Sequence, residues 1–214
     1  MHSRIINETE AFVRDYLRGV ESGHNWWHIS RVRNTAMLIL SQEKNADPFI
    51  TEMGALVHDI DDHKIRENRH GDKMLEHYLD DLEINNISKK KIIHIVKHVS
   101  FRDSFNGPYE RNRELDIVQD ADRLDALGAI GIARAFNYGG SKGLEIYIPG
   151  TKPRSYNSAG DYISSDSSTI NHFYEKLLKL KDMMNTATGR RMAEERHMYM
   201  EAFLQQFYSE WGEN

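Results

Sequence analysis

Residues 55–60 read ALVHDI, and they close a segment in which apolar side chains recur at helical spacing. The segment opens with Asp47 and Pro48, a typical helix N-cap followed by a proline that loses no hydrogen bond at the first helical position. The expected buried face comprises Met53, Leu56, Val57 and Ile60. The pattern therefore predicts a helix that carries His58 and Asp59 near its end.

The same periodicity extends along most of the chain. Further helices are predicted over residues 3–19, 29–45, 67–83, 89–99 and 114–136. Ser88 is the expected N-cap of the helix that follows it, while Gly128 and Gly131 would let a neighbouring helix approach closely. Two more helices are expected within residues 168–214. The predicted fold class is all-α, a single helical domain over residues 1–214.

One long segment lacks helical periodicity. Residues 137–167 are rich in glycine and serine, and loops of this length inside compact domains are usually functional lids or locally disordered. Alternation of Leu144, Ile146 and Ile148 indicates a small strand or hairpin within the loop. Basic side chains there would suit a mobile lid over an anionic substrate, and an ordinary surface loop explains them equally well. They are Lys142, Lys152 and Arg154.

The composition is that of an ordinary globular protein, because 39% of the 214 residues are hydrophobic and 29% are charged. A formal net charge of −5 gives no general attraction to nucleic acid, so small-molecule chemistry is expected. The absence of cysteine excludes disulfides and thiolate chemistry, and it fits a reducing compartment. No apolar run reaches the length of a signal peptide or a membrane span, so a cytoplasmic protein is expected.

Two polar features lie on otherwise apolar helices. Asp122 belongs to residues 119–127, QDADRLDAL, and a buried carboxylate needs either an arginine or a metal ion as its partner. His58 and Asp59 point about 100° apart on a helix, so both bind one ion only when it lies between their directions. A histidine satisfied within the core is the commoner explanation of such a pair.

A third polar feature lies at the start of the second helix. His24, His28 and Arg31 are spaced to share one face, opposite or oblique to the apolar stripe. This spacing favours an anion or metal site, and the alternative is a solvated polar face. Trp26 and Trp27 are interpreted as core anchors at the helix start.

The order of these features carries a resemblance. His28 stands in HISRV, His58 and Asp59 in ALVHDI, and Asp122 in ADRLDA. This pattern resembles the HD-domain phosphohydrolases, a family named after its His-Asp doublet, and it implies that the four residues bind a metal ion. Small stand-alone bacterial HD hydrolases are similar over nearly the whole chain, including HNWWH at 24–28, YGGSKG at 138–143 and FYEKL at 173–177.

The resemblance implies a metal-dependent phosphohydrolase that acts on a nucleotide or another phosphorylated, anionic small molecule through a metal-activated water. Two imidazoles and two carboxylates would suit a divalent Mn, Mg, Fe, Co, Ni or Zn ion. Asp62 and Asp125 are the expected proton-transfer residues. The residues expected to contact substrate are His24, Arg31, Lys64, His98 and Arg123.

Two other functions stay open at this point. A di-iron oxygenase of the HD type would need additional histidines around a second ion. The candidates are His70, His77, His94 and His98, and only His98 has a suitable register. A non-catalytic, metal-stabilised ligand-binding module is the other alternative. A homo-oligomer is also open, because the aromatic C-terminal helix could pack within the chain or against a second copy.

Overall fold

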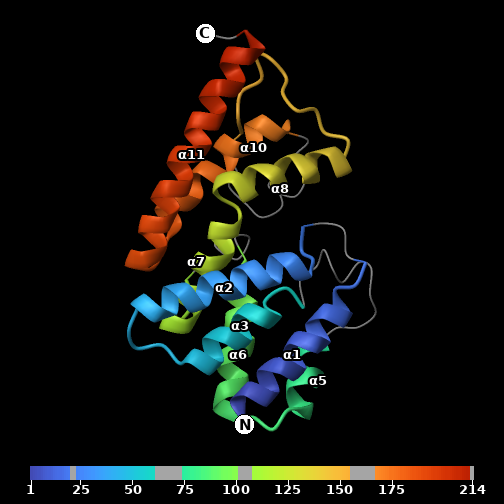
Figure 1. Ribbon diagram of the computed structural model, residues 1–214, viewed down its shortest axis with the longest axis vertical. Coiled ribbons are helices and arrows are strands. Elements are labelled where there is room, and N and C mark those ends of the chain that lie inside the picture. The colour runs from blue at the N-terminus through green and yellow to red at the C-terminus, as the bar shows by residue number, and fades with distance from the viewer. Residues whose placement is uncertain (20–22, 61–73, 101–107, 155–166, 213–214) are drawn as a thin grey trace. The chain divides into compact units, whose positions relative to one another are not determined.

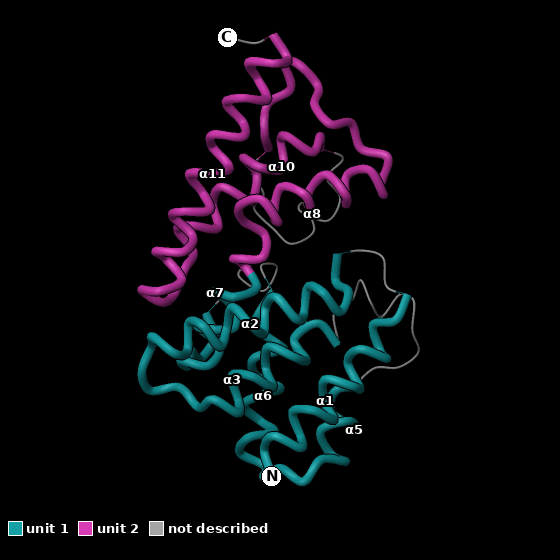
Figure 2. The backbone as a smooth tube through the Cα atoms, in the orientation of Figure 1, with its two compact units in different colours: residues 1–122 teal, residues 123–214 magenta. Residues whose placement is uncertain are grey.

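The computed structural model describes residues 1–19, 23–60, 74–100, 108–154 and 167–212 (Figure 1). Every regular element in these residues is a helix, which confirms the predicted all-α class. The chain divides into two compact units, residues 1–122 and 123–214 (Figure 2). The expectation of one domain over the whole chain stays a prediction. None of the helices in the described parts has the length and apolar character that crossing a bilayer requires.

The first unit is built around α3 (Pro48–Val57), and all residues of this helix except Pro48 and Glu52 are buried. Three helices contact α3, namely α1 (His2–Tyr16), α2 (Trp26–Gln42) and α6 (Asn86–His98). A Cβ at Gly54 would lie 2.8 Å from Cδ1 of Ile95, so glycine allows α6 to approach closely. The unit also contains α5 (Met74–Asp81) and most of α7 (Arg113–Asp125). The His-Asp doublet therefore follows directly on an enclosed, well-supported helix.

The sequence predicted the N-cap residues of two helices, and one of the two predictions is correct. Asp47 caps α3 as predicted, and its Oδ1 accepts hydrogen bonds from the N–H groups of Phe49 at 2.9 Å and Ile50 at 3.2 Å. The prediction of Ser88 as the cap of α6 is wrong. Asn85 caps this helix instead, since its side-chain oxygen accepts the N–H of Ser88 at 2.9 Å. An asparagine amide satisfies a first-turn donor as well as a serine hydroxyl does.

The long helix predicted over residues 114–136 is two helices, α7 and α8 (Gly128–Ser141). Gly128 adopts φ +70°, a backbone conformation that is strained for any residue with a Cβ atom. Leu127, which precedes it, has an extended backbone. A Cβ at Gly131 would lie 2.2 Å from the carbonyl oxygen of Ala126. Gly131 thus serves the turn between α7 and α8, and not the close approach of a neighbouring helix.

Alanine at Gly131 is expected to destabilise the protein by about 1–3 kcal/mol, the usual cost of an extra methyl group in a packed site. The matched control is Gly140→Ala on the same helix, where a Cβ meets no atom within 4 Å. That control should be neutral or stabilising by up to about 1 kcal/mol, because alanine favours helix more than glycine does. Urea unfolding followed by circular dichroism measures both, and equal midpoints for the two variants would contradict the steric argument.

The second unit packs α8 against α10 (Thr169–Glu175) and α11 (Ala187–Trp211). A 3₁₀ helix, η2 (Leu177–Met183), lies between α10 and α11 in the chain and contacts both. The predicted first C-terminal helix is therefore divided at Lys176. Phe173 is fully buried, and its ring lies 5.9 Å from that of Phe203 and 6.1 Å from that of Phe136. These aromatic rings form the centre of the unit.

The hairpin predicted around residues 144–148 is wrong, because the described part of this loop, residues 142–154, contains no strand. Its carbonyl groups accept hydrogen bonds from the first turn of α10 instead. The N–H of Thr169 donates to Glu145 O and that of Ile170 to Ile146 O, both at 3.0 Å. The loop also begins later than predicted, since α8 continues to Ser141. Residues 155–166 of the predicted lid lie outside the described residues, so the lid stays a prediction.

Candidate metal centre

The N-terminus of α2 holds the first histidine of the centre. Asn25 caps this helix, and its side-chain oxygen accepts the N–H groups of Trp27 at 3.1 Å and His28 at 3.2 Å. The His28 side chain is only 1% exposed. The sequence-based placement of His28 away from the buried side of α2 is therefore wrong. Trp27, interpreted as a core anchor, is 65% exposed.

His58 directly follows α3 and keeps helical backbone angles, with φ −59° and ψ −27°. Its Nδ1 donates a hydrogen bond to the carbonyl oxygen of Ala55 at 2.9 Å. Because this bond holds the proton on Nδ1, the lone pair of Nε2 is directed away from the backbone. Nε2 of His58 lies 3.2 Å from Nε2 of His28. The end of α3 thus sets both the tautomer and the direction of the imidazole.

Asp122 reaches the same two nitrogen atoms from α7. Its Oδ1 lies 3.4 Å from Nε2 of His28 and 3.8 Å from Nε2 of His58. The side chain is 27% exposed, so the carboxylate lies at the edge of the centre and not within the core. Of the two partners considered from the sequence, an arginine or a metal ion, the imidazole cluster favours the metal ion.

Asp59 joins the cluster through both carboxylate oxygens. Oδ2 lies 2.8 Å from Nδ1 of His24 and 3.5 Å from Nε2 of His28, while Oδ1 lies 3.5 Å from Nε2 of His58. Burial raises the pKa of Asp59, but the electrostatic attraction of His24, His58 and His28 and the hydrogen bond from His24 outweigh it. The pKa of Asp59 therefore lies well below its usual value, and the group is an anion.

The spacing of these atoms fits a single divalent ion. Ligand atoms at about 2.1 Å from one ion lie about 3.0 Å apart at octahedral angles and about 3.4 Å apart at tetrahedral angles. The separations of 3.2 Å between His28 and His58 and 3.4 Å between His28 and Asp122 lie in this range. Those from Asp59 to each imidazole, 3.5 Å, and from His58 to Asp122, 3.8 Å, are slightly longer. Among the described residues, two sets have ligand atoms within 4.8 Å of one another, His24–His28–Asp59 and His28–His58–Asp122. Nitrogen and oxygen donors of this kind could hold a divalent metal.

Known proteins share both the sequence pattern and the fold. The model of the HD domain family matches residues 26–127, the part of the chain that contains His28, His58, Asp59 and Asp122. The uncharacterized protein YpgQ of Bacillus subtilis is 41% identical over 203 residues, which are 93% of this chain and 90% of YpgQ. The chain belongs to the HD domain family.

Solved structures extend this similarity over nearly the whole HD protein. A protein of Lactobacillus plantarum is 36% identical with a TM-score of 0.87, over 98% of this chain and 97% of that one. An HD-superfamily hydrolase of Bacillus thuringiensis is 40% identical with a TM-score of 0.77, over 100% of both chains. Bacillus subtilis YpgQ in complex with ADP is 39% identical with a TM-score of 0.76, over 96% and 97%. The predicted resemblance to small stand-alone bacterial HD proteins is confirmed.

Not every residue predicted for the HD site is brought to the imidazole cluster. Asp62 and Lys64 lie outside the described residues. Arg31 is half-buried on α2. His24 approaches Asp59, although it precedes the helix cap and so does not share a face of α2 with His28 and Arg31 as the sequence predicted.

Asp125 and Arg123 have partners in the second unit. The buried carboxylate of Asp125 lies 2.7 Å from Nη1 of Arg134. Arg123 is buried as well, and its Nη1 donates a hydrogen bond to the carbonyl oxygen of Met183. Both contacts stabilise the local structure. The expected roles of Asp125 in proton transfer and of Arg123 in substrate binding stay predictions.

The additional histidines do not extend the cluster within the described residues. His77 is exposed on α5, and His94 donates a hydrogen bond to a main-chain carbonyl at 2.7 Å. His98 stacks on Tyr109, with ring centroids 4.6 Å apart. None of these three belongs to a group whose geometry could hold an ion, and His70 lies outside the described residues. A second ion therefore has no support among the described residues, and the number of ions stays open.

The sequence analysis did not predict a structural role for Gln119, which lies one turn before Asp122 on α7. This side chain is 2% exposed, and its Nε2 donates to the carbonyl oxygen of His98 at 2.6 Å and to the hydroxyl of Tyr109 at 2.7 Å. It joins the end of α6 to the helix that carries Asp122. The available signal was a long polar amide on the apolar side of a predicted helix.

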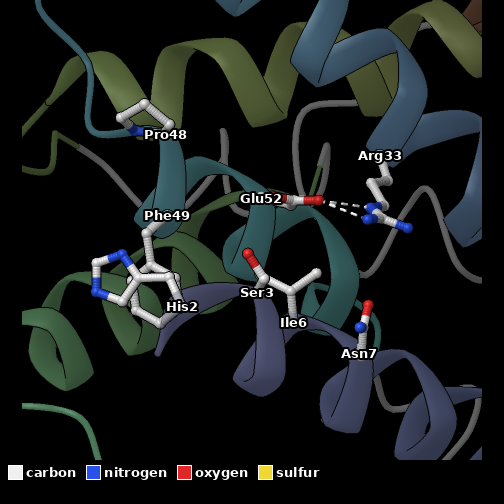
Figure 3. A pocket seen from close by; sticks show the side chains of 8 residues that line it. All are labelled: His2, Ser3, Ile6, Asn7, Arg33, Pro48, Phe49 and Glu52. Atoms are coloured by element: carbon white, nitrogen blue, oxygen red, sulfur yellow. Dashed lines mark hydrogen bonds and ion pairs between the residues drawn. The ribbon is translucent and has the colours of Figure 1, made fainter.

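The described residues also contain a cavity of about 300 Å³ away from the predicted site residues (Figure 3). Arg33 on its wall is held by Glu52, with Nη2 and Oε1 2.6 Å apart, and by Glu10, with Nη1 and Oε2 2.9 Å apart. The lining residues are His2, Ser3, Ile6, Asn7, Arg33, Pro48, Phe49 and Glu52. Because the arginine charge is already compensated, the cavity offers little attraction for a phosphate group.

Proposed function

We propose that this HD protein is a metal-dependent hydrolase of phosphate esters or anhydrides. The proposal rests on one observation, the convergence of two imidazole Nε2 atoms and two aspartate carboxylates within a few ångströms. His28, His58, Asp59 and Asp122 are the proposed ligands. A divalent ion held there would lower the pKa of a bound water and polarise a phosphoryl oxygen.

The chain contributes the geometry for this chemistry. Asn25 holds the start of α2, and the Ala55 carbonyl keeps the proton of His58 on Nδ1. In the hydrolysis the water oxygen bonds to phosphorus, the bond to the leaving oxygen breaks, and a proton passes from the water to the leaving group. Asp62 is the proposed proton acceptor, because Asp125 already pairs with Arg134.

A nucleotide is the proposed substrate class, because the related Bacillus subtilis YpgQ was solved in complex with ADP. Two aspartates and one divalent ion leave the centre without excess positive charge, so an anionic substrate needs further cations. Arg31 and Lys64 are proposed for this role, Arg31 because it follows His28 by about one helical turn. The absence of cysteine and the net charge of −5 support a small-molecule enzyme of the cytoplasm.

Removal of the metal is expected to abolish hydrolysis. The protein is treated with a chelator, dialysed, and assayed with and without added Mn²⁺ against nucleoside mono-, di- and triphosphates and a general phosphate ester. We expect release of phosphate or pyrophosphate only with the ion, at a rate at least about a hundredfold above that of the metal-free protein.

Three outcomes would contradict the proposal. Hydrolysis that is unchanged by chelation would show that the centre is not catalytic. Turnover that requires iron and dioxygen, and disappears under anaerobic conditions in Mn²⁺, would identify an oxygenase. A loss of thermal stability on chelation, without hydrolysis of any compound, would identify a metal-stabilised binding module.

A further inference from the structure

His24 makes the shortest contact of the imidazole and carboxylate cluster. Its Nδ1 lies 2.8 Å from Oδ2 of Asp59, and the ring is 18% exposed. The other separations in the cluster that involve Asp59 are 3.5 Å, to Nε2 of His28 and to Nε2 of His58. A separation of 2.8 Å is typical of a charge-assisted hydrogen bond, whereas two ligands of one ion usually lie about 3.0–3.4 Å apart. The contact is therefore a hydrogen bond from His24 to Asp59.

The two oxygens of Asp59 consequently have different surroundings. Both oxygens lie 3.5 Å from an imidazole Nε2, Oδ2 from that of His28 and Oδ1 from that of His58, but only Oδ2 accepts the hydrogen bond from His24. A carboxylate that is held at one oxygen can no longer rotate, so the other oxygen keeps a constant direction. The hydrogen bond thus prepares Oδ1 as an ion ligand and also offsets the burial of the negative charge.

The backbone before α2 holds His24 for this contact. Gly23 adopts φ +79°, which turns the chain ahead of the helix, and Asn25 then caps α2 through its side chain. The His24 ring meets the His28 ring edge-on, at 5.7 Å between centroids and 79° between planes. One capped turn therefore positions both histidines, one toward Asp59 and one toward the centre of the cluster.

We propose that His24 is a positioning residue, which holds the Asp59 carboxylate in its ion-binding orientation and touches neither the ion nor the substrate. This inference rests on the proposed metal site and deepens it. It replaces the sequence-based expectation that His24 contacts the substrate. A substrate contact would change KM alone, whereas a positioning residue changes the affinity for the ion when no substrate is present.

The test measures Mn²⁺ binding by isothermal titration calorimetry, without substrate, for the native chain and four variants. His24→Ala should weaken binding about 10- to 100-fold, the usual effect of losing a partner of a metal ligand. His24→Asn keeps a nitrogen donor near the Nδ1 position and should stay within about threefold of the native affinity. His24→Gln carries its donor near the Nε2 position and should behave like His24→Ala. His77→Ala, on an exposed histidine of α5, is the matched control.

Each alternative gives a different result. Native affinity in His24→Ala and His24→Gln, with only KM raised, would overturn the inference in favour of a substrate contact. A third imidazole around bound Co²⁺ in X-ray absorption spectra would also overturn it, because His24 would then be a ligand. If the native chain itself binds no ion, the proposed function fails together with the inference. Activity of His24→Ala that recovers at saturating Mn²⁺ is the result expected for a positioning residue.

Discussion

Replacing Asp59 by alanine is expected to eliminate both metal binding and hydrolysis. Even a partner of a metal ligand typically contributes 10- to 100-fold to metal affinity, so the loss of a ligand should lower the affinity by more than about a hundredfold. The change also removes the only carboxylate within 3.5 Å of both imidazoles in the described residues. Calorimetric titration with Mn²⁺ and the phosphate-release assay measure the two effects.

A second aspartate on a contributing helix provides the control. Asp116 on α7 is also buried, but it pairs with Nη2 of Arg111 at 2.7 Å and belongs to neither ion site found among the described residues. Asp116→Asn should therefore keep the native metal affinity, although its stability will fall somewhat. If Asp59→Ala and Asp116→Asn bound Mn²⁺ equally well, the ion would have to be held elsewhere.

The largest effect on stability is expected from Phe173→Ala in the second unit. Phe173 is 0% exposed, and the rings of Phe136 and Phe203 lie about it at 6.1 and 5.9 Å. Deletion of a fully buried phenylalanine side chain costs about 3–5 kcal/mol, because burial is lost and a cavity forms. The midpoint of urea unfolding, followed by circular dichroism, should fall accordingly.

Met198→Ala is the matched control for this truncation. Met198 lies on α11 and is 57% exposed, so its loss should change the free energy of unfolding by no more than about 0.5 kcal/mol. Similar midpoints for Phe173→Ala and Met198→Ala would mean that the aromatic rings do not form the core of the unit. The affinity for Mn²⁺ can be measured on the same samples.

The helical class could be predicted from the sequence because its signals are local. Apolar residues one turn apart define a buried face wherever the helix packs, and Asp47 with Pro48 marks a helix start from neighbouring residues alone. Local signals fail where two of them compete. Asn85 and Ser88 are both good caps, and only the backbone around Asn85 decides which side chain reaches a first-turn N–H.

The break between α7 and α8 and the loop around residues 144–148 depend on contacts that the local sequence pattern does not contain. Gly128 and Gly131 were both predicted to let another helix approach. Gly128 does so, because a Cβ there would lie 3.1 Å from Cγ of Arg196 on α11, whereas Gly131 serves the turn between α7 and α8. Residues 144–148 alternate as a strand does, but the carbonyl groups of Glu145 and Ile146 accept hydrogen bonds from the first turn of α10, 24 residues later in the sequence. Alternation in a sequence indicates which side chains are apolar, and it does not indicate which donors the backbone will meet.

For the site, the sequence by itself determined which residues are candidates, because His28, the His58-Asp59 doublet and Asp122 occur in a recognisable order. Only the tertiary structure decided how their atoms are used. It turns Nε2 of His58 inward through the Ala55 carbonyl, pairs His24 with Asp59, and engages Asp125 with Arg134. Hydrogen bonds and metal coordination act over about 2–3 Å, so they depend on the directions of single atoms, which arise only when distant segments pack together.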